Sequence, residues 1–210
     1  MVTREIPRLN HDNETRNKII ETAINLFAAK GFSAVSMRDI AKDAGITIAA
    51  IYHYHDGKAD LLDEIFRFFT RAYLHYFEWL SKMNERATTL EEVMDNMFNP
   101  EFVDMLDPLG FLVISIAMKE QHNIASARRC VFKLFYGHSI QSMKADFDRL
   151  IDLGVIPPTD TKTLATLFMF SVMASNDIRV HEYLGTEPPL GCKEIYAGLK
   201  EHITSTLRHG

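Results

Sequence analysis

The chain has 210 residues, 47% of them hydrophobic, and a formal net charge of −5. This length suits one small domain and one of moderate size, each with its own core. The longest apolar run is far shorter than the roughly 20 residues that span a bilayer, the N-terminus lacks the apolar segment of a secretory signal, and two distant cysteines give no disulfide framework, so a cytoplasmic location is expected.

The first predicted helix carries an apolar stripe at helical spacing. The stripe consists of Ile20, Ala23, Ile24 and Phe27. Lys30 and Gly31 follow it, and a basic last turn before glycine is typical of a helix end. The sequence therefore predicts a first helix that is longer than the two that follow and is stopped by Lys30 and Gly31.

Two short helices follow, separated by a glycine. Ser36 and Asp39 have the spacing of a capping box, which predicts a helix that begins near Met37. Gly45 ends it, because glycine enters the left-handed conformation without steric cost. Thr47 is a good N-cap for a third helix of about two turns. Three helices around a small core are the result.

The run from Thr15 to Leu62 resembles the N-terminal domain of the TetR family of bacterial transcriptional repressors. The resemblance rests on motifs in a fixed order: Phe27-Ala-Ala-Lys-Gly31-Phe32, Ser36-Met-Arg38-Asp-Ile40-Ala41, Ala44-Gly45-Ile46-Thr47 and Ile51-Tyr52-His53-Tyr54, followed by Lys58 and Leu61-Leu62. It implies a helix-turn-helix domain over residues 1–58 that binds a double-stranded DNA operator. Residues 59–210 are then an effector-binding and dimerisation domain.

This sequence departs from the family pattern in the third helix. Ile48 and Ala50 are apolar where relatives often have a basic and a hydroxyl residue, and His55 stands where an aromatic residue is usual. Base reading then depends either on apolar contact with thymine methyl groups or on DNA shape. The residues expected to contact DNA are Arg38, Thr47, Ile48, Ala49, Tyr52, His53 and Lys58.

Several of these residues have a second interpretation. Lys58 either meets a phosphate or is an exposed lysine on a turn. Tyr52 either contacts DNA or is a core aromatic, and Arg38 either reaches DNA or pairs with nearby aspartates. Lys and Arg equal Asp and Glu in number over residues 1–60, so the affinity depends on where the cations point.

Beyond residue 60 the pattern is helical throughout, which makes the fold class all-α. The expected helices cover about 60–84, a segment capped by Thr88 and Glu91, a brief helix at 101–107, a buried one at 109–122, and long ones at 126–153, 161–184 and 193–207. The pair 126–153 and 161–184 is apolar most of the way round. The resemblance implies that this pair forms a four-helix interface in a homodimer.

The second domain is rich in aromatic and methionine side chains, which can line a pocket for a small hydrophobic or aromatic effector. The candidate lining residues are Phe69, Tyr73, Phe77, Met94, Phe98, Phe102, Phe111, Met118, Phe135, Tyr136 and His138. Each one alone also fits a plain core. Occupancy of the pocket would shift the helix at 60–84 and so change the separation of the two DNA-binding domains.

Other classes of function have less support. The histidines lack the spacing and the neighbouring carboxylates of a zinc site. No glycine-rich phosphate loop, nucleophile elbow or distinctive acid pair indicates an enzyme, so no catalytic residue and no cofactor is expected. A helical scaffold with weakened DNA reading remains an alternative because of Ile48 and Ala50.

Overall fold

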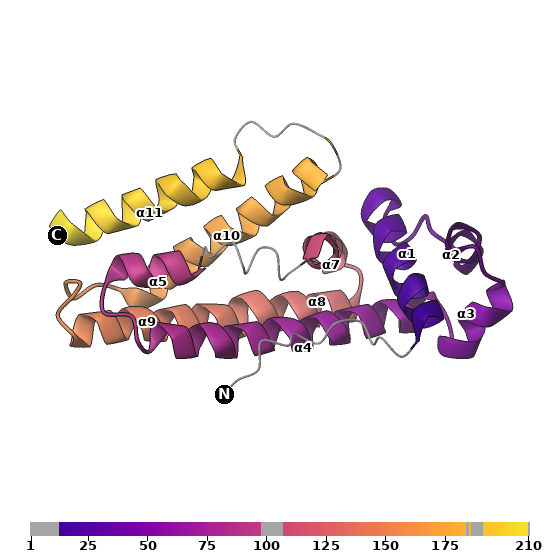
Figure 1. Ribbon diagram of the computed structural model, residues 1–210, viewed down its shortest axis with the longest axis horizontal. Coiled ribbons are helices and arrows are strands. Elements are labelled where there is room, and N and C mark those ends of the chain that lie inside the picture. The colour runs from indigo at the N-terminus through magenta and orange to yellow at the C-terminus, as the bar shows by residue number, and fades with distance from the viewer. Residues whose placement is uncertain (1–12, 98–106, 184, 186–190, 210) are drawn as a thin grey trace. The chain divides into compact units, whose positions relative to one another are not determined.

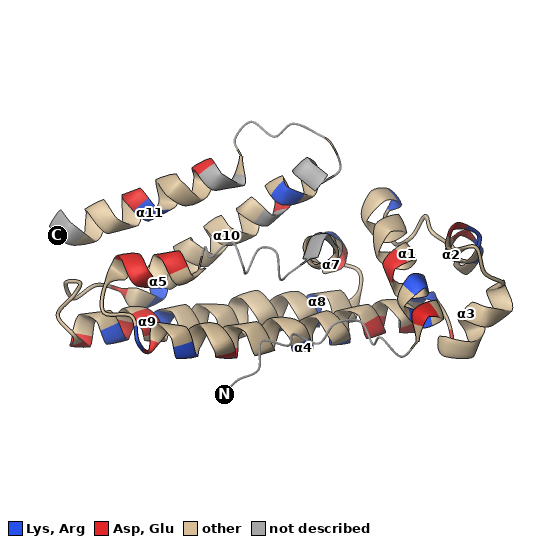
Figure 2. Cartoon of the chain, in the orientation of Figure 1, with Lys and Arg blue, Asp and Glu red and all other residues tan. Residues whose placement is uncertain are grey.

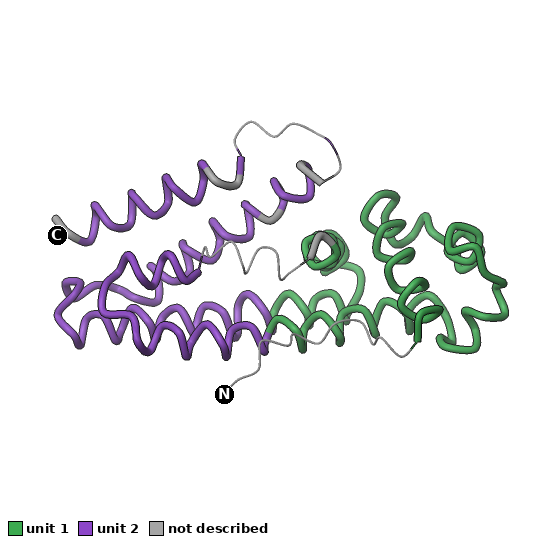
Figure 3. Tube along the Cα trace, in the orientation of Figure 1, with its two compact units in different colours: residues 1–73, 108–132 green, residues 74–107, 133–210 purple. Residues whose placement is uncertain are grey.

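The computed structural model describes residues 13–97, 107–183, 185 and 191–209, and all the regular elements of this part of the chain are helices (Figure 1). They group into two compact units, one of residues 1–73 and 108–132 and the other of residues 74–107 and 133–210 (Figure 3). The expected all-α class is confirmed. None of the helices in the described part is long and apolar enough to cross a membrane.

The first unit begins with α1 (Glu14–Lys30), which has the predicted apolar face. Asn13 caps its N-terminus by accepting the backbone N–H of Arg16 at 3.0 Å. The predicted stripe is buried, and Phe27 is 2% exposed. Gly31 ends the helix with φ 83°, a conformation that favours glycine.

The helices α2 (Met37–Ala44) and α3 (Ile48–Tyr54) have the predicted caps. Ser36 and Asp39 form the capping box, in which each residue accepts the other's backbone N–H. Gly45 adopts φ 65° and ψ 33° in the turn, and Thr47 Oγ1 accepts the N–H of Ala50 at 3.2 Å. Each of α1, α2 and α3 contacts the other two, which completes the three-helix arrangement expected from the sequence.

Three more helices belong wholly or partly to the first unit. They are α4 (Lys58–Asn84), α7 (Asp107–Glu120) and α8 (Ala125–Val131). The chain passes from the first unit to the second inside α4, after Tyr73, returns to the first at residue 108, and leaves it again after Phe132. By packing, the first unit therefore extends past residue 58, and the expected functional boundary at 58/59 stays a prediction.

The second unit contains the last part of α4, together with α5 (Leu90–Met97), all but the first residue of η1 (Phe132–Ser139), α9 (Ile140–Asp152), α10 (Thr161–Tyr183) and α11 (Cys192–His209). α10 packs on both α9 and α11, and α11 also contacts α5. The brief helix expected at 101–107 lies mostly outside the described residues. Gly154, with φ 69°, ends α9 as predicted.

Two expectations differ from the structure in this unit. The cap of α5 is Thr89 with Glu92, one residue later than the predicted pair Thr88 and Glu91, since Thr89 Oγ1 accepts the N–H of Glu92 and the Glu92 carboxylate accepts the N–H of Thr89, both at 3.1 Å. The helical segment predicted over 126–153 runs without a break from Ala125 to Asp152, but its middle is the π-helix η1, which the sequence did not predict. A π segment shifts the phase of the following helix relative to the preceding one.

A buried polar cluster joins α4, α5 and α9 in the second unit. Asn84 donates to Asp146 at 2.6 Å and accepts from Asn96 at 3.0 Å. Arg149 donates to the carbonyl oxygens of Asn84 (2.6 Å), the last residue of α4, and of Ala87 (2.7 Å) in the segment that follows. Burial raises the pKa of Asp146 to about 6.

Candidate nucleic-acid interface

The third helix presents one continuous outer face to solvent. Thr47, Ile48, Ala49, Tyr52 and His53 are exposed, whereas Ile51 is fully buried and anchors the helix. Residues 48 and 52 are four positions apart, as are residues 49 and 53. Residues with this spacing lie on the same face of a helix, one turn above the other. Tyr52 is 52% exposed, which rules out the core-aromatic interpretation and leaves its side chain available for contact.

α3 carries no Lys, Arg, Asp or Glu, so any charged contact with DNA must come from other elements (Figure 2). Arg38 and Lys42 are exposed on α2. Asp39, a suggested partner of Arg38, instead accepts the N–H and the hydroxyl of Ser36, and these hydrogen bonds lower its pKa. Among the described residues Arg38 forms no ion pair, so its guanidinium can meet a phosphate.

Lys58 has a role that neither sequence interpretation anticipated. Its ammonium donates to the carbonyl oxygens of Phe32 (2.7 Å) and Val35 (2.6 Å) and lies 4.3 Å from the centre of the Phe32 ring. The side chain thereby fastens the loop between α1 and α2 to the start of α4. A phosphate contact by Lys58 stays a prediction, and it would have to compete with these bonds. No local pattern could reveal carbonyl partners more than 20 residues away.

The C-terminal end of α3 is held by a buried histidine that sequence reasoning did not single out as a site. His55 is 1% exposed, and its Nδ1 lies 3.3 Å from Glu64 Oε2 and 3.7 Å from Asp60 Oδ2. Glu64 also pairs with Arg16 of α1. Burial lowers the pKa of His55, although the two carboxylates oppose this. The usual aromatic residue at position 55 was the signal that this side chain is buried.

Phe32, in the loop between α1 and α2, also contacts α7. The N–H of Phe32 donates to Glu120 Oε1 at 3.2 Å, while its carbonyl accepts from Lys58. Both backbone groups of one loop residue are therefore bound by long side chains from other helices of the first unit. These bonds hold the loop that leads into α2.

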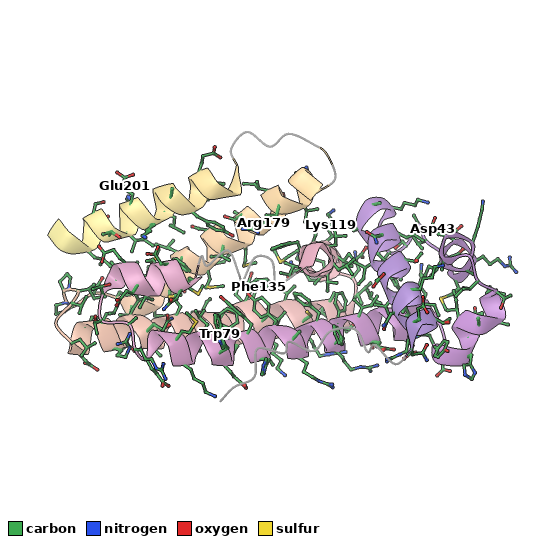
Figure 4. All side chains as sticks on the ribbon, viewed as in Figure 1. Asp43, Trp79, Lys119, Phe135, Arg179 and Glu201 are labelled. Carbon is green, nitrogen blue, oxygen red and sulfur yellow. The ribbon has the colours of Figure 1, made fainter. Side chains whose placement is uncertain are left out.

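The candidate effector-pocket residues are distributed over both units. Phe69, Tyr73, Phe111 and Met118 belong to the first unit, and Phe77, Met94, Phe135, Tyr136 and His138 belong to the second. Phe98 and Phe102 lie outside the described residues. Phe135 is 2% exposed in the interior of the second unit (Figure 4), and Phe77 and His138 stack edge to face with centroids 5.8 Å apart. A common pocket stays a prediction.

Part of the second unit has an apolar surface. Leu167 and Phe170 on α10 are 62% and 47% exposed, and Tyr136 on η1 is 40% exposed, with its ring centroid 6.1 Å from that of Phe170. Tyr136 thus lies at the surface. Large apolar side chains that cluster outside a core commonly mark an interaction site.

Metal-binding and thiol groups do not form a second site in the described residues. They contain no cluster of three or more histidine, cysteine or acidic side chains that could hold a metal ion. Cys130 is buried, accepts a hydrogen bond from Thr70 at 3.5 Å, and has its pKa raised to about 11 by burial. Such a thiol is unreactive.

Comparison with known proteins matches the first domain to one family. The family model for bacterial regulatory proteins of the tetR family covers residues 19–65. The probable HTH-type transcriptional regulator YttP of Bacillus subtilis (strain 168) is 35% identical over 119 residues, 57% of this chain and 49% of the relative. The HTH-type transcriptional repressor KstR2 of Rhodococcus jostii (strain RHA1) is 33% identical over 84 residues, 40% of this chain and 41% of the relative. The alignments thus span about half the length of these relatives.

The fold of the whole chain also has solved counterparts. The ketosteroid transcriptional regulator KstR2 of Mycobacterium tuberculosis superposes with a TM-score of 0.69 and covers 98% of both chains at 18% identity. At this identity the likeness concerns the fold alone. It extends the similarity from the three-helix domain to the helical remainder.

Proposed function

The chain belongs to the TetR family of bacterial regulatory proteins, and on this premise we propose that it is a dimeric, cytoplasmic transcriptional repressor. It binds a palindromic DNA operator through α3 and is released by a small hydrophobic or aromatic molecule. The observation that carries the proposal is the solvent-exposed outer face of α3, which is anchored from behind by Ile51. A helix held in this way can enter the major groove without rearrangement.

Dimerisation supplies the second half of the DNA contact. Two copies of α3 about 34 Å apart reach successive major grooves on one side of the duplex, and a two-fold axis matches a palindromic site. The apolar surface of Tyr136, Leu167 and Phe170 supports a partner on α10. The family resemblance implies that this helix lies in the dimer interface.

The effector part of the proposal rests on the abundance of buried aromatic side chains. Phe69, Tyr73, Phe77 and Phe135 are each at most 7% exposed, and side chains of this kind line apolar binding sites. A ligand releases DNA only if it binds the two arrangements of the dimer with unequal affinity. Effector binding must therefore weaken operator binding, and operator binding must weaken effector binding, by the same factor.

A gel-shift titration with the DNA that flanks the chain's own gene tests DNA binding. We expect retardation that weakens steeply as salt rises. The double variant Tyr52→Ala with His53→Ala should lose about tenfold or more in affinity, since it removes two contacts from exposed positions. Glu201→Ala, an exposed change on α11 (Figure 4), is the matched control. Unshifted DNA at low salt, or a double variant that binds like wild type, would overturn the proposal.

A further inference from the structure

The first turn of α3 offers almost no hydrogen-bonding group to DNA. Ile48 is 36% exposed and Ala49 is exposed beside it. Thr47 precedes them, and its hydroxyl oxygen already accepts the N–H of Ala50 as the helix cap. The polar side chains of the helix, Tyr52 and His53, stand one turn later.

This placement matters because the N-terminal residues of a recognition helix contact base edges. The side chains that read bases by hydrogen bonds are chiefly Arg, Lys, Asn, Gln, Asp, Glu, Ser and Thr, and none of them occurs in α3. Thr47, just before the helix, uses its hydroxyl oxygen as the cap. An isoleucine pressed against the polar edge of a G·C pair would leave base donors and acceptors without water or a partner, which is costly. The C5-methyl group of thymine is the apolar feature of the major groove.

We propose that Ile48 and Ala49 read thymine methyl groups, so that each operator half-site has A·T pairs beneath the first turn of α3. This inference rests on the proposed function, because it requires α3 to lie in the major groove. It specifies what that helix selects. Arg38 and Lys42 then hold the phosphates and position the helix without contributing to this selection.

The apolar turn can act in this way because its backbone is fixed. The Thr47 cap holds the beginning of α3, and Ile51 is fully buried behind the exposed face. At the other end of the helix, the backbone N–H of His55 donates to the carbonyl oxygen of Ile51 at 3.0 Å. A methyl-sized contact contributes only when the side chain is held in place, since ordering a mobile one would cost as much entropy as the contact returns.

The test begins with selection of bound duplexes from a pool with random base pairs, using the full-length wild-type protein. Each thymine of the enriched site is then replaced, one at a time, by uracil, which removes only the methyl group. Affinities are measured by fluorescence anisotropy at one fixed salt concentration. Burial of one methyl group corresponds to about a fourfold change in affinity, so we expect a loss of about this size at one or two thymines of each half-site.

The variant Ile48→Ala separates direct contact from DNA shape. Alanine shortens the side chain and favours the helix, so the fold is retained. In this variant at least one of the sensitive thymines should tolerate uracil without further loss. His53→Ala is the matched control: it removes the contact proposed for His53 and so lowers the overall affinity, but it leaves the first turn unchanged and should keep the full uracil penalty at the same thymines.

The outcomes distinguish this inference from the function on which it rests. Failure to enrich any duplex would contradict the proposed function itself. Tight binding to an enriched duplex that is indifferent to uracil would overturn thymine reading and leave DNA binding intact. A uracil penalty of equal size in wild type and Ile48→Ala would also overturn it, because the penalty would then come from DNA shape.

Discussion

The ammonium of Lys58 and the carbonyl oxygen of Phe32 meet at 2.7 Å across 26 residues of sequence. A second bond to the carbonyl of Val35 and the position of the ammonium over the Phe32 ring complete this contact. The loop that carries α2 is therefore attached to α4 by one side chain. The strength of this Lys58 contact should therefore affect the stability of the DNA-binding helices.

Replacement of Lys58 by methionine should destabilise the first unit. Methionine retains most of the aliphatic length but leaves two carbonyl groups without a charged donor, which costs about 1–3 kcal/mol for part-buried groups. Thermal unfolding followed by circular dichroism measures the loss. Lys42→Met on exposed α2 is the control and should unfold like wild type. Equal melting temperatures for wild type and Lys58→Met would show that the Lys58 contact contributes nothing to the stability of the folded chain.

Local sequence signals predicted the architecture of the first unit because each signal acts within a few residues. The capping box of Ser36 and Asp39, the left-handed Gly45 and the Thr47 cap are all found where the spacing predicts them. The partners of Lys58 and the contact between His55 and Glu64 could not be predicted in the same way. They depend on tertiary packing between residues distant in sequence.

In the second unit, too, sequence patterns predicted the helices but not all of their details. Apolar periodicity predicted the extent of α10 and α11 closely, but it could not reveal η1, since a π segment changes the hydrogen-bond register without changing the composition. The cap of α5 was displaced by one residue because Thr88 and Thr89 are equally good caps, and the choice between them depends on the position of Glu92.

His55 should make the stability of the first unit depend on pH. Burial holds the pKa of its imidazole below the ordinary 6.5 in the folded chain, against the opposing charges of Glu64 and Asp60 and together with that of Arg16. The unfolded chain therefore binds a proton more readily. This contribution to stability is complete above pH 6.5 and is lost as the pH falls through the window below it.

The variant His55→Phe isolates this effect. Phenylalanine fills a similar volume in a buried position and cannot titrate, so the decrease in melting temperature between pH 7.5 and pH values below 6 should be smaller than in wild type. His53→Phe, at an exposed position of the same helix, should retain the wild-type slope. If His55→Phe and wild type lose stability in parallel as the solution is acidified, the buried imidazole is not the group responsible.

Asp146 should act in the opposite direction in the second unit. Burial raises the pKa of its carboxyl to about 6, and the hydrogen bond from Asn84 only partly offsets this. Between about pH 4 and 6 the folded chain keeps a proton that the unfolded chain releases, so this carboxyl lowers stability as the pH rises through that window. At neutral pH the penalty is at most about 3 kcal/mol.

Asp146→Asn should therefore melt at a higher temperature than wild type at pH 7.5 and at nearly the same temperature at pH 4. The asparagine oxygen can still accept from Asn84, which retains the contact with α4. Asp152→Asn changes an exposed carboxyl at the end of α9 and should alter neither value. A destabilised Asp146→Asn at pH 7.5 would mean that the charge of Asp146 is needed beside Arg149.

The apolar surface of the second unit leads to a prediction about assembly. Phe170 is 47% exposed on α10, and a glutamate there would place a charge in the middle of the proposed dimer interface. Burial of an unpaired carboxylate is costly, so Phe170→Glu should be monomeric in light scattering after size exclusion at concentrations where wild type is a dimer. Its far-ultraviolet circular dichroism should match wild type, because the side chain is largely outside the core. Val155→Glu tests whether a charge at any exposed apolar residue would have this effect: Val155 is 38% exposed in the turn between α9 and α10, outside both helices of the expected interface, and this variant should remain dimeric. If Phe170→Glu dimerises with wild-type affinity, the interface lies elsewhere on the chain. If monomeric Phe170→Glu binds palindromic DNA as tightly as wild type, DNA binding does not depend on dimerisation.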